Sequence, residues 1–125
     1  YLKKIGSISV KRNKVTKENL GFFDEIKNKI DHSNRPVIIF PQATRVLPNE
    51  RPIFKKGSAR IYEELKIFCQ PIAINSGYVW PKKGNKVPNK EITISILKPI
   101  SPGLTKENFI KILEKNIYSE LDLIN

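Results

Sequence analysis

The chain has 125 residues, a length that suits one domain, and 39% of them are apolar, which excludes an intrinsically disordered composition. Lysine and arginine number 23 against 12 acidic residues, which gives a net charge of +11. A charge this far from zero predicts an anionic partner, and nucleic acid, an acidic membrane surface and a phosphorylated ligand all stay open. The longest uninterrupted apolar run, residues 37–40, is far shorter than the ~20 residues of a membrane-spanning helix.

The first third of the chain alternates predicted strands and helices. Residues 8–10 predict a short strand that ends near Arg12. Thr16 suits a helix N-cap, and the helix that follows is expected to close before Pro36. Residues 37–40 are rich in β-branched side chains and bounded by prolines, as expected of a buried central strand. The helix is predicted from apolar residues at helical spacing, namely Leu20, Phe23, Ile26 and Ile30.

The rest of the chain continues this alternation. Residues 57–65 predict a helix, and Thr105 is expected to cap a last one, whose apolar stripe is Ile110, Leu113, Ile117 and Leu121. Residues 71–74 and 91–97 predict strands, the second because isoleucines alternate with polar residues. Two long irregular segments join these elements, the proline-containing residues 41–56 and the basic residues 78–90.

Strands separated by helices predict an α/β fold, with a mostly parallel or mixed sheet flanked by helices and residues 1–125 as a single, partial domain. In such sheets ligands bind beyond the carboxyl ends of the strands. The segments that follow Val10 and Phe40 are expected to lie there.

Basic side chains follow these two predicted strands. Arg45 offers a planar fork that matches phosphate oxygens, and Arg12 follows the preceding strand. Lys55 and Lys56 directly precede a predicted helix, whose free N–H groups already favour an anion. The pattern predicts a phosphate site, although a chain with 23 basic residues also produces such clusters as ordinary solvated surface.

Three sequence blocks follow one another along the chain: Gly-Ser-Ile-Ser-Val-Lys-Arg at residues 6–12, Phe-Pro-Gln-Ala-Thr-Arg at 40–45 with Phe-Lys-Lys-Gly-Ser-Ala at 54–59, and Gln-Pro-Ile-Ala-Ile-Asn-Ser-Gly at 70–77. They resemble the glycine-to-arginine, F-P-E-G-T-R and V-P-V-A-I-N-S-G blocks of the glycerolipid acyltransferases, in particular those that act on 1-acylglycerol-3-phosphate. Trp80 also lies where that family often has a tryptophan.

The resemblance implies transfer of a fatty acyl group from acyl-CoA or acyl-carrier protein to lysophosphatidate, giving phosphatidate without a metal or a cofactor. It implies that the acyl or thioester side is shaped by Pro71, Ile72 and Ala73. It implies that the acceptor's phosphate is held by Arg12, Gln42, Thr44, Arg45, Lys56 and Gly57.

The family's catalytic H-x4-D pair is absent. The only histidine, His32, lies in a predicted turn, and the fifth residue after it is Val37. In the family the pair precedes the glycine-to-arginine block, and this chain contains no methionine, so a further segment is expected ahead of Tyr1. The chain is therefore expected to be the C-terminal portion of such an enzyme and to lack activity by itself.

Two residues depart from the F-P-E-G-T-R block. Gln42 replaces a glutamate and loses its charge, but it keeps a carbonyl oxygen that is expected to accept a hydrogen bond from Arg45. Ala43 replaces a glycine, and if this position needs a positive φ, the Cβ costs on the order of 1 kcal/mol.

The basic segment around Trp80 suggests a membrane contact, with the protein at the cytoplasmic face of the inner membrane, either peripheral or anchored by an N-terminal part. The segment contains four lysines, and tryptophan favours the interfacial layer of a bilayer. A flexible loop with a packed tryptophan fits the sequence equally well.

The alternative function is a non-catalytic basic module that binds lipid phosphate or nucleic acid. Nucleic acid is disfavoured, because no arginine-interleaved aromatic platform is visible. Cys69 lies in an apolar run and is expected to be a buried, inert thiol.

Overall fold

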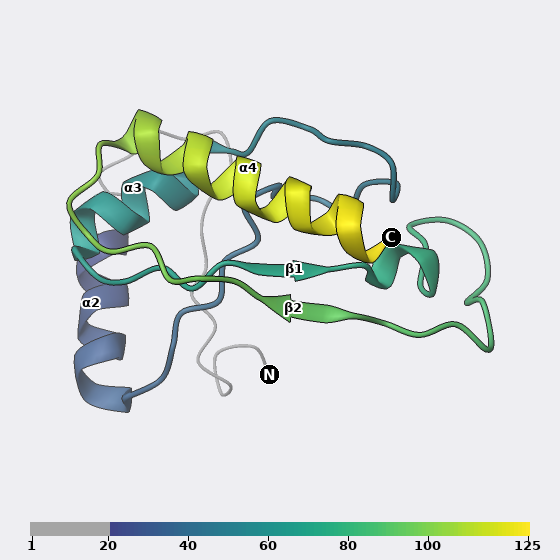
Figure 1. Cartoon of the computed structure of the whole chain (residues 1–125). Helices are drawn as coiled ribbons and strands as arrows, with labels where there is room; N and C mark the ends of the chain where they lie inside the picture. Colours follow the sequence, from purple (N-terminus) through teal and green to yellow (C-terminus); the bar gives the residue numbers. More distant parts are fainter. Residues whose placement is uncertain (1–20) are drawn as a thin grey trace. The chain divides into compact units, whose positions relative to one another are not determined.

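The computed structural model describes residues 21–125, and the chain divides into two compact units, Tyr1–Ile39 and Phe40–Asn125 (Figure 1). The first unit is described here through helix α2, and the second through α3, α4 and two short strands. The predicted strand at residues 8–10 and the predicted N-cap Thr16 lie outside the described residues.

Helix α2 (Phe22–Ser33) confirms the predicted helix of the first unit and ends before Pro36 as predicted, but its N-cap is Gly21 and not Thr16. Its buried side chain is Ile26, from the predicted apolar stripe. The helix stops where Asn34 takes the left-handed conformation, with φ 49° and ψ 32°, which asparagine tolerates. His32 therefore lies within α2, near its C-terminal end. The prediction that His32 lies in a non-helical turn after the helix was wrong.

Residues 37–40 do not form the predicted central strand. The segment has no strand assignment, and Ile38 and Phe40 are both more than three quarters exposed. An apolar run becomes a strand only when neighbouring strands accept and donate its backbone hydrogen bonds. The residues that the structure describes provide no such neighbour here.

The two helices of the second unit follow the sequence pattern closely. Helix α3 (Lys56–Leu65) begins one residue before the predicted position and ends at Lys66, which is left-handed with φ 52°. Helix α4 (Lys106–Ile124) begins at Thr105, whose hydroxyl accepts a hydrogen bond from the Asn108 N–H at 3.3 Å. The predicted N-cap is therefore confirmed.

The sheet differs from the predicted parallel or mixed one. Strands β1 (Ile72–Ile74) and β2 (Ile94–Ile96) pair antiparallel, and a bridge between Cys69 and Ile100 continues the ladder. A parallel pair needs a crossover connection, usually through an α-helix, whereas residues 75–93 contain only the 3₁₀ turn η1 (Ser76–Tyr78). Without a crossover helix the chain turns back and runs antiparallel.

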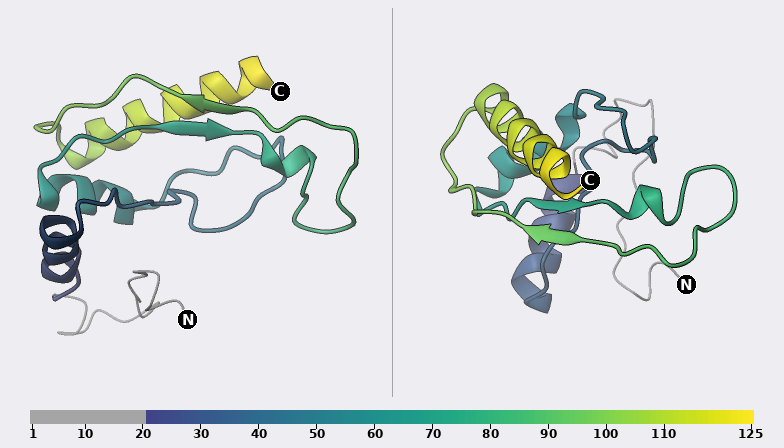
Figure 2. Two further views of the ribbon diagram at one scale, coloured as in Figure 1. Left: turned by 90° about the horizontal axis from the view of Figure 1, so that it is seen from below. Right: turned by 45° about the vertical axis from the view of Figure 1, so that its right-hand side comes forward.

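Helix α4 covers one face of this two-stranded sheet, and α3 packs beside α4 (Figures 1 and 2). Ala73 of β1 is fully buried, and the Ser95 hydroxyl donates to a Glu120 carboxylate oxygen of α4 at 2.6 Å. The register pairs isoleucines on the opposite face, where all four side chains are 45% or more exposed: Ile72 with Ile96, and Ile74 with Ile94.

The core of the second unit lies between α3 and α4. The rings of Tyr62 and Phe109 stack with centroids 3.9 Å apart and planes 7° apart. The Tyr62 hydroxyl also donates to the carbonyl of Ser101 at 2.5 Å and accepts from the N–H of Leu104 at 3.1 Å. The buried cluster consists of Phe54, Ala59, Tyr62, Ile100, Phe109 and Leu113. Among the described residues, no helix combines the length and the apolar character that crossing a bilayer requires.

Candidate substrate-binding site

The candidate site begins with a tight turn at the start of the second unit. The Ala43 N–H donates to the Phe40 carbonyl at 2.9 Å, so Pro41 occupies the second position of a four-residue turn, where its fixed φ is favoured. Ala43, at the fourth position, has φ 58°. The position therefore has the positive φ that the sequence left open as one possibility, and the alanine Cβ is strained there.

Replacing Ala43 with glycine is expected to raise the free energy of unfolding by about 1 kcal/mol, because glycine adopts a positive φ without the clash of a Cβ. The matched control is Ala59→Gly within helix α3, where the same exchange removes a buried methyl group and a good helix former. Urea unfolding should therefore show opposite signs for the two variants. A loss of stability in Ala43→Gly would contradict the strain.

A backbone hydrogen bond closes the long segment that follows this turn. The Lys55 N–H donates to the Pro41 carbonyl at 2.8 Å, so the turn lies next to the start of α3. Lys55 is the extended N-cap residue and gives no side-chain cap, which leaves the first N–H groups of the helix to other acceptors. Lys56 and Gly57 are exposed there, and a Cβ added to Gly57 would meet nothing within 4 Å. Two of the predicted phosphate residues thus lie at an open, anion-favouring helix terminus.

Helix α4 holds the segment from its other side. The Tyr118 hydroxyl donates to the Pro52 carbonyl and accepts from the Gln42 amide at 3.2 Å, and a Glu114 carboxylate oxygen accepts from the Phe54 N–H at 2.9 Å. Burial raises the pKa of Tyr118 above its ordinary value, so its hydroxyl keeps the proton that it donates. Gln42 therefore contacts Tyr118 through its amide group, in place of the expected bond to Arg45.

The sequence interpretation missed these residues of α4. Arg51 forms an ion pair with Asp122 at 2.9 Å, and its guanidinium lies 5.4 Å from the centre of the Tyr118 ring. Glu114, Tyr118 and Asp122 recur at every fourth position, which places them on one face of the helix. This polar stripe runs along α4 beside the predicted apolar stripe, and it was the sequence signal that could have identified these three residues.

Arg45 points to a different neighbour. Its Nη2 donates to the carbonyl oxygens of Trp80 at 2.9 Å and Pro81 at 3.2 Å, and the guanidinium lies 5.9 Å from the centre of the Trp80 ring. These bonds use one nitrogen of an exposed guanidinium, whose other N–H groups have no acceptor in the part of the chain that the structure describes. Arg45 thus joins the turn to the basic segment while keeping donors free for an anion.

The other predicted site residues are in varied surroundings. Thr44 is exposed beside Arg45, and Arg12 lies outside the described residues. On the predicted acyl side, Pro71 and Ala73 are fully buried, whereas Ile72 is 48% exposed. Only Ile72 of these three therefore presents its side chain to a ligand at the surface of the second unit.

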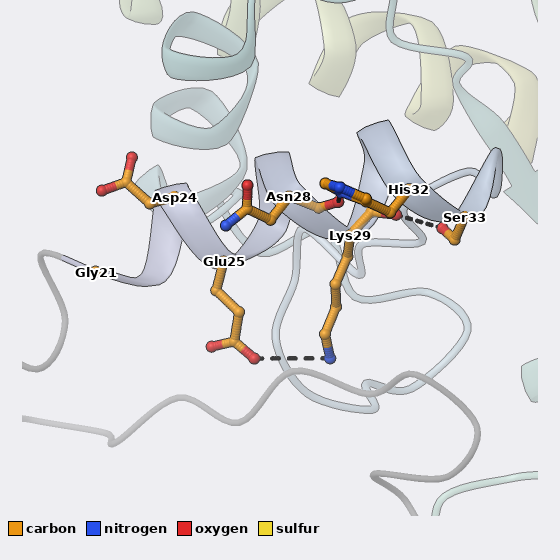
Figure 3. A pocket seen from close by; sticks show the side chains of 7 residues that line it. All are labelled: Gly21, Asp24, Glu25, Asn28, Lys29, His32 and Ser33. Atoms are coloured by element: carbon orange, nitrogen blue, oxygen red, sulfur yellow. Dashed lines mark hydrogen bonds and ion pairs between the residues drawn. The ribbon is translucent and has the colours of Figure 1, made fainter.

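His32 belongs to a separate feature, an open hollow of about 620 Å³ along α2 (Figure 3). Its Nδ1 lies 2.7 Å from the Asn28 carbonyl, which can only accept, so the ring proton is on Nδ1. No predicted site residue lines this hollow. All of its lining residues come from α2 or the position before it: Gly21, Asp24, Glu25, Asn28, Lys29, His32 and Ser33.

Cys69 is half-buried, and desolvation raises the pKa of its thiol above the ordinary value. A raised pKa lowers the thiolate fraction at neutral pH, which fits the inert thiol expected from the sequence. Within residues 21–125, no three His, Cys, Asp or Glu side chains lie close enough together to hold a metal ion.

Comparison with known proteins places the chain within a family. A family model described as acyltransferase matches residues 1–75, which include every predicted phosphate and acyl residue. A 1-acyl-sn-glycerol-3-phosphate acyltransferase of Helicobacter pylori is 28% identical over 96 residues, which are 75% of this chain and 40% of that protein. The chain thus spans about two fifths of this relative, and no solved structure matches. Because the family model covers more than half of the chain, and as the three sequence blocks predicted, the chain belongs to the acyltransferase family.

Proposed function

We propose that the chain is the acceptor-holding part of a 1-acylglycerol-3-phosphate acyltransferase. In the longer protein, the free hydroxyl of lysophosphatidate attacks the thioester carbonyl of acyl-CoA or acyl-carrier protein, the thiol leaves, and phosphatidate forms. The family match and the similarity to a 1-acyl-sn-glycerol-3-phosphate acyltransferase support this proposal. The same match gives no support to a nucleic-acid-binding module.

The observation that carries the proposal is the hydrogen bond between the Lys55 N–H and the Pro41 carbonyl. It draws together two sequence blocks that are separated along the chain, the turn after Phe40 and the first turn of α3. The start of α3, with the positive end of the helix dipole and the exposed Lys56, therefore lies next to the turn. This combination suits a dianionic phosphate monoester better than an uncharged acceptor.

We further propose that the protein works at the cytoplasmic face of the inner membrane, either peripherally or through an N-terminal anchor. The acceptor is itself a membrane lipid, so a site that holds its headgroup must reach the bilayer surface. The positive charge of the chain is suited to that surface.

Neutralising Lys56 is expected to weaken the binding of a water-soluble, short-chain lysophosphatidate about 10-fold or more, the loss typical of a charged hydrogen bond. The matched control is Lys66→Gln, which removes the same charge from the exposed C-cap at the other end of α3. Isothermal titration of wild type, Lys56→Gln and Lys66→Gln measures the difference. Arg45→Ala is also expected to reduce the affinity, because only one nitrogen of its guanidinium is bonded within the described residues.

The corresponding monoacylglycerol, which lacks the phosphate, separates a lost contact from a disturbed fold. Its affinity should be equal in all of these variants. Equal affinity of wild type, Lys56→Gln and Arg45→Ala for the phosphorylated ligand would contradict the proposed site.

A further inference from the structure

We infer that residues 78–90, which we call the basic loop, form a preformed docking surface for an anionic membrane. The inference concerns a surface beyond the residues that the family model matches. It holds whichever acceptor the enzyme uses, and Arg45 is the residue that it shares with the proposed phosphate site.

The basic loop is held in shape by backbone hydrogen bonds. The Val87 N–H donates to the Val79 carbonyl at 2.9 Å, which closes the loop at its base, and the Trp80 N–H donates to the Ser76 carbonyl at 2.8 Å. Gly84 has φ 95°, a conformation that lets the chain reverse between the two sides. Figures 1 and 2 show that the loop lies at the opposite end of the strands from α3.

Arg45 holds the basic loop close to its base, at the two residues that follow Val79. Its two bonds to the carbonyls of Trp80 and Pro81 hold the backbone directly beneath the tryptophan ring. Because these contacts exist before any partner binds, docking orders few additional residues. The entropic cost of association is correspondingly small.

The Trp80 side chain is exposed to solvent and is not packed into the second unit. Its side chain is 56% exposed, with the Lys86 Nζ 4.1 Å and the Arg45 guanidinium 5.9 Å from the ring centre. An exposed indole flanked by cations matches the headgroup layer of a bilayer, where the ring meets the acyl boundary and the cations meet phosphates. The packed tryptophan that the sequence also allowed is not what the structure shows.

The charged side chains of the basic loop are all positive. Residues 78–90 contain no aspartate or glutamate, and all of the loop's lysines are exposed: Lys82, Lys83, Lys86 and Lys90. Each lysine close to an anionic leaflet increases binding about five-fold.

The test compares two variants that each lose two positive charges. Lys82→Gln/Lys83→Gln alters the basic loop, whereas Lys111→Gln/Lys115→Gln alters exposed positions on α4. Sedimentation with vesicles of phosphatidylcholine and phosphatidylglycerol in equal parts should show about 30-fold weaker binding for the loop variant, since two lysines contribute. The α4 variant should bind nearly as wild type does.

Trp80 is the only tryptophan, so its fluorescence reports directly on the loop. Its emission should shift to the blue with the anionic vesicles and recover at about 1 M salt, where the Debye length falls to about 3 Å. Pure phosphatidylcholine vesicles should produce little shift.

Three results would overturn the inference. The first is equal vesicle binding by the loop variant and wild type, and the second is an equal blue shift with neutral lipid. The third is binding to a DNA duplex that falls in the loop variant, together with no binding to either kind of vesicle.

Discussion

Replacing Phe109 with alanine is expected to lower the free energy of unfolding of the second unit by about 3–5 kcal/mol. The ring is 1% exposed and stacks on Tyr62 in the centre of the α3–α4 core. The change removes the apolar area, leaves a cavity between two helices and takes away the stacking partner of Tyr62. For a small unit this is a large part of the whole stability.

The matched control is Phe68→Ala, because Phe68 lies in the same unit and is 67% exposed. It undergoes the same truncation without opening a cavity, so we expect its free energy of unfolding to change by no more than about 0.5 kcal/mol. Urea unfolding followed by Trp80 emission reports on this unit, which contains the only tryptophan. Similar losses in the two variants would contradict the placement of the core at Phe109.

The 125-residue chain is expected to transfer no acyl group from acyl-CoA to lysophosphatidate above background. Attack by a glycerol hydroxyl near neutral pH needs a general base, and histidine usually serves. The single histidine, His32, has its Nδ1 bonded to the carbonyl of Asn28 in its own helix, with no carboxylate in an H-x4-D relation. Loss of a general base typically lowers the rate about 10²–10⁴-fold.

A longer form that supplies an H-x4-D block ahead of residues 6–12 should be active, and His32→Ala should leave that activity unchanged. A radiolabelled acyl-CoA assay compares four proteins, namely the 125-residue chain and the longer form, each with and without His32→Ala, with heat-treated enzyme as the background. Turnover by the 125-residue chain that disappears in His32→Ala would contradict both the absence of a catalytic block and the role assigned to the helix terminus.

Several local features were predictable because neighbours in the sequence decide them. Thr105 caps α4 through a hydrogen bond to an N–H three residues on, and residues 57–65 are helical as their periodicity indicates. The turn at residues 40–43 has proline at its second position, where the fixed φ of proline is favoured. The alternation of Ile94 and Ile96 with Ser95 likewise identified a strand and its two faces.

The family could also be recognised from the sequence, because its blocks are short motifs in a fixed order. The family model then matched residues 1–75. Those blocks mark which residues are shared with the family. They do not show which neighbours each residue contacts in this chain.

Tertiary structure decided the pairings, because each joins groups far apart in the sequence. Alternation indicates an apolar face but is the same for parallel and antiparallel neighbours, so the direction of β1 and β2 depended on how residues 75–93 return. Residues 37–40 have strand composition, yet no described neighbour pairs with their backbone. Arg45 bonds the carbonyl of Trp80, and Gln42 bonds Tyr118. A guanidinium can donate to a carbonyl oxygen as well as to a phosphate, so only the folded chain determines which acceptor lies within reach.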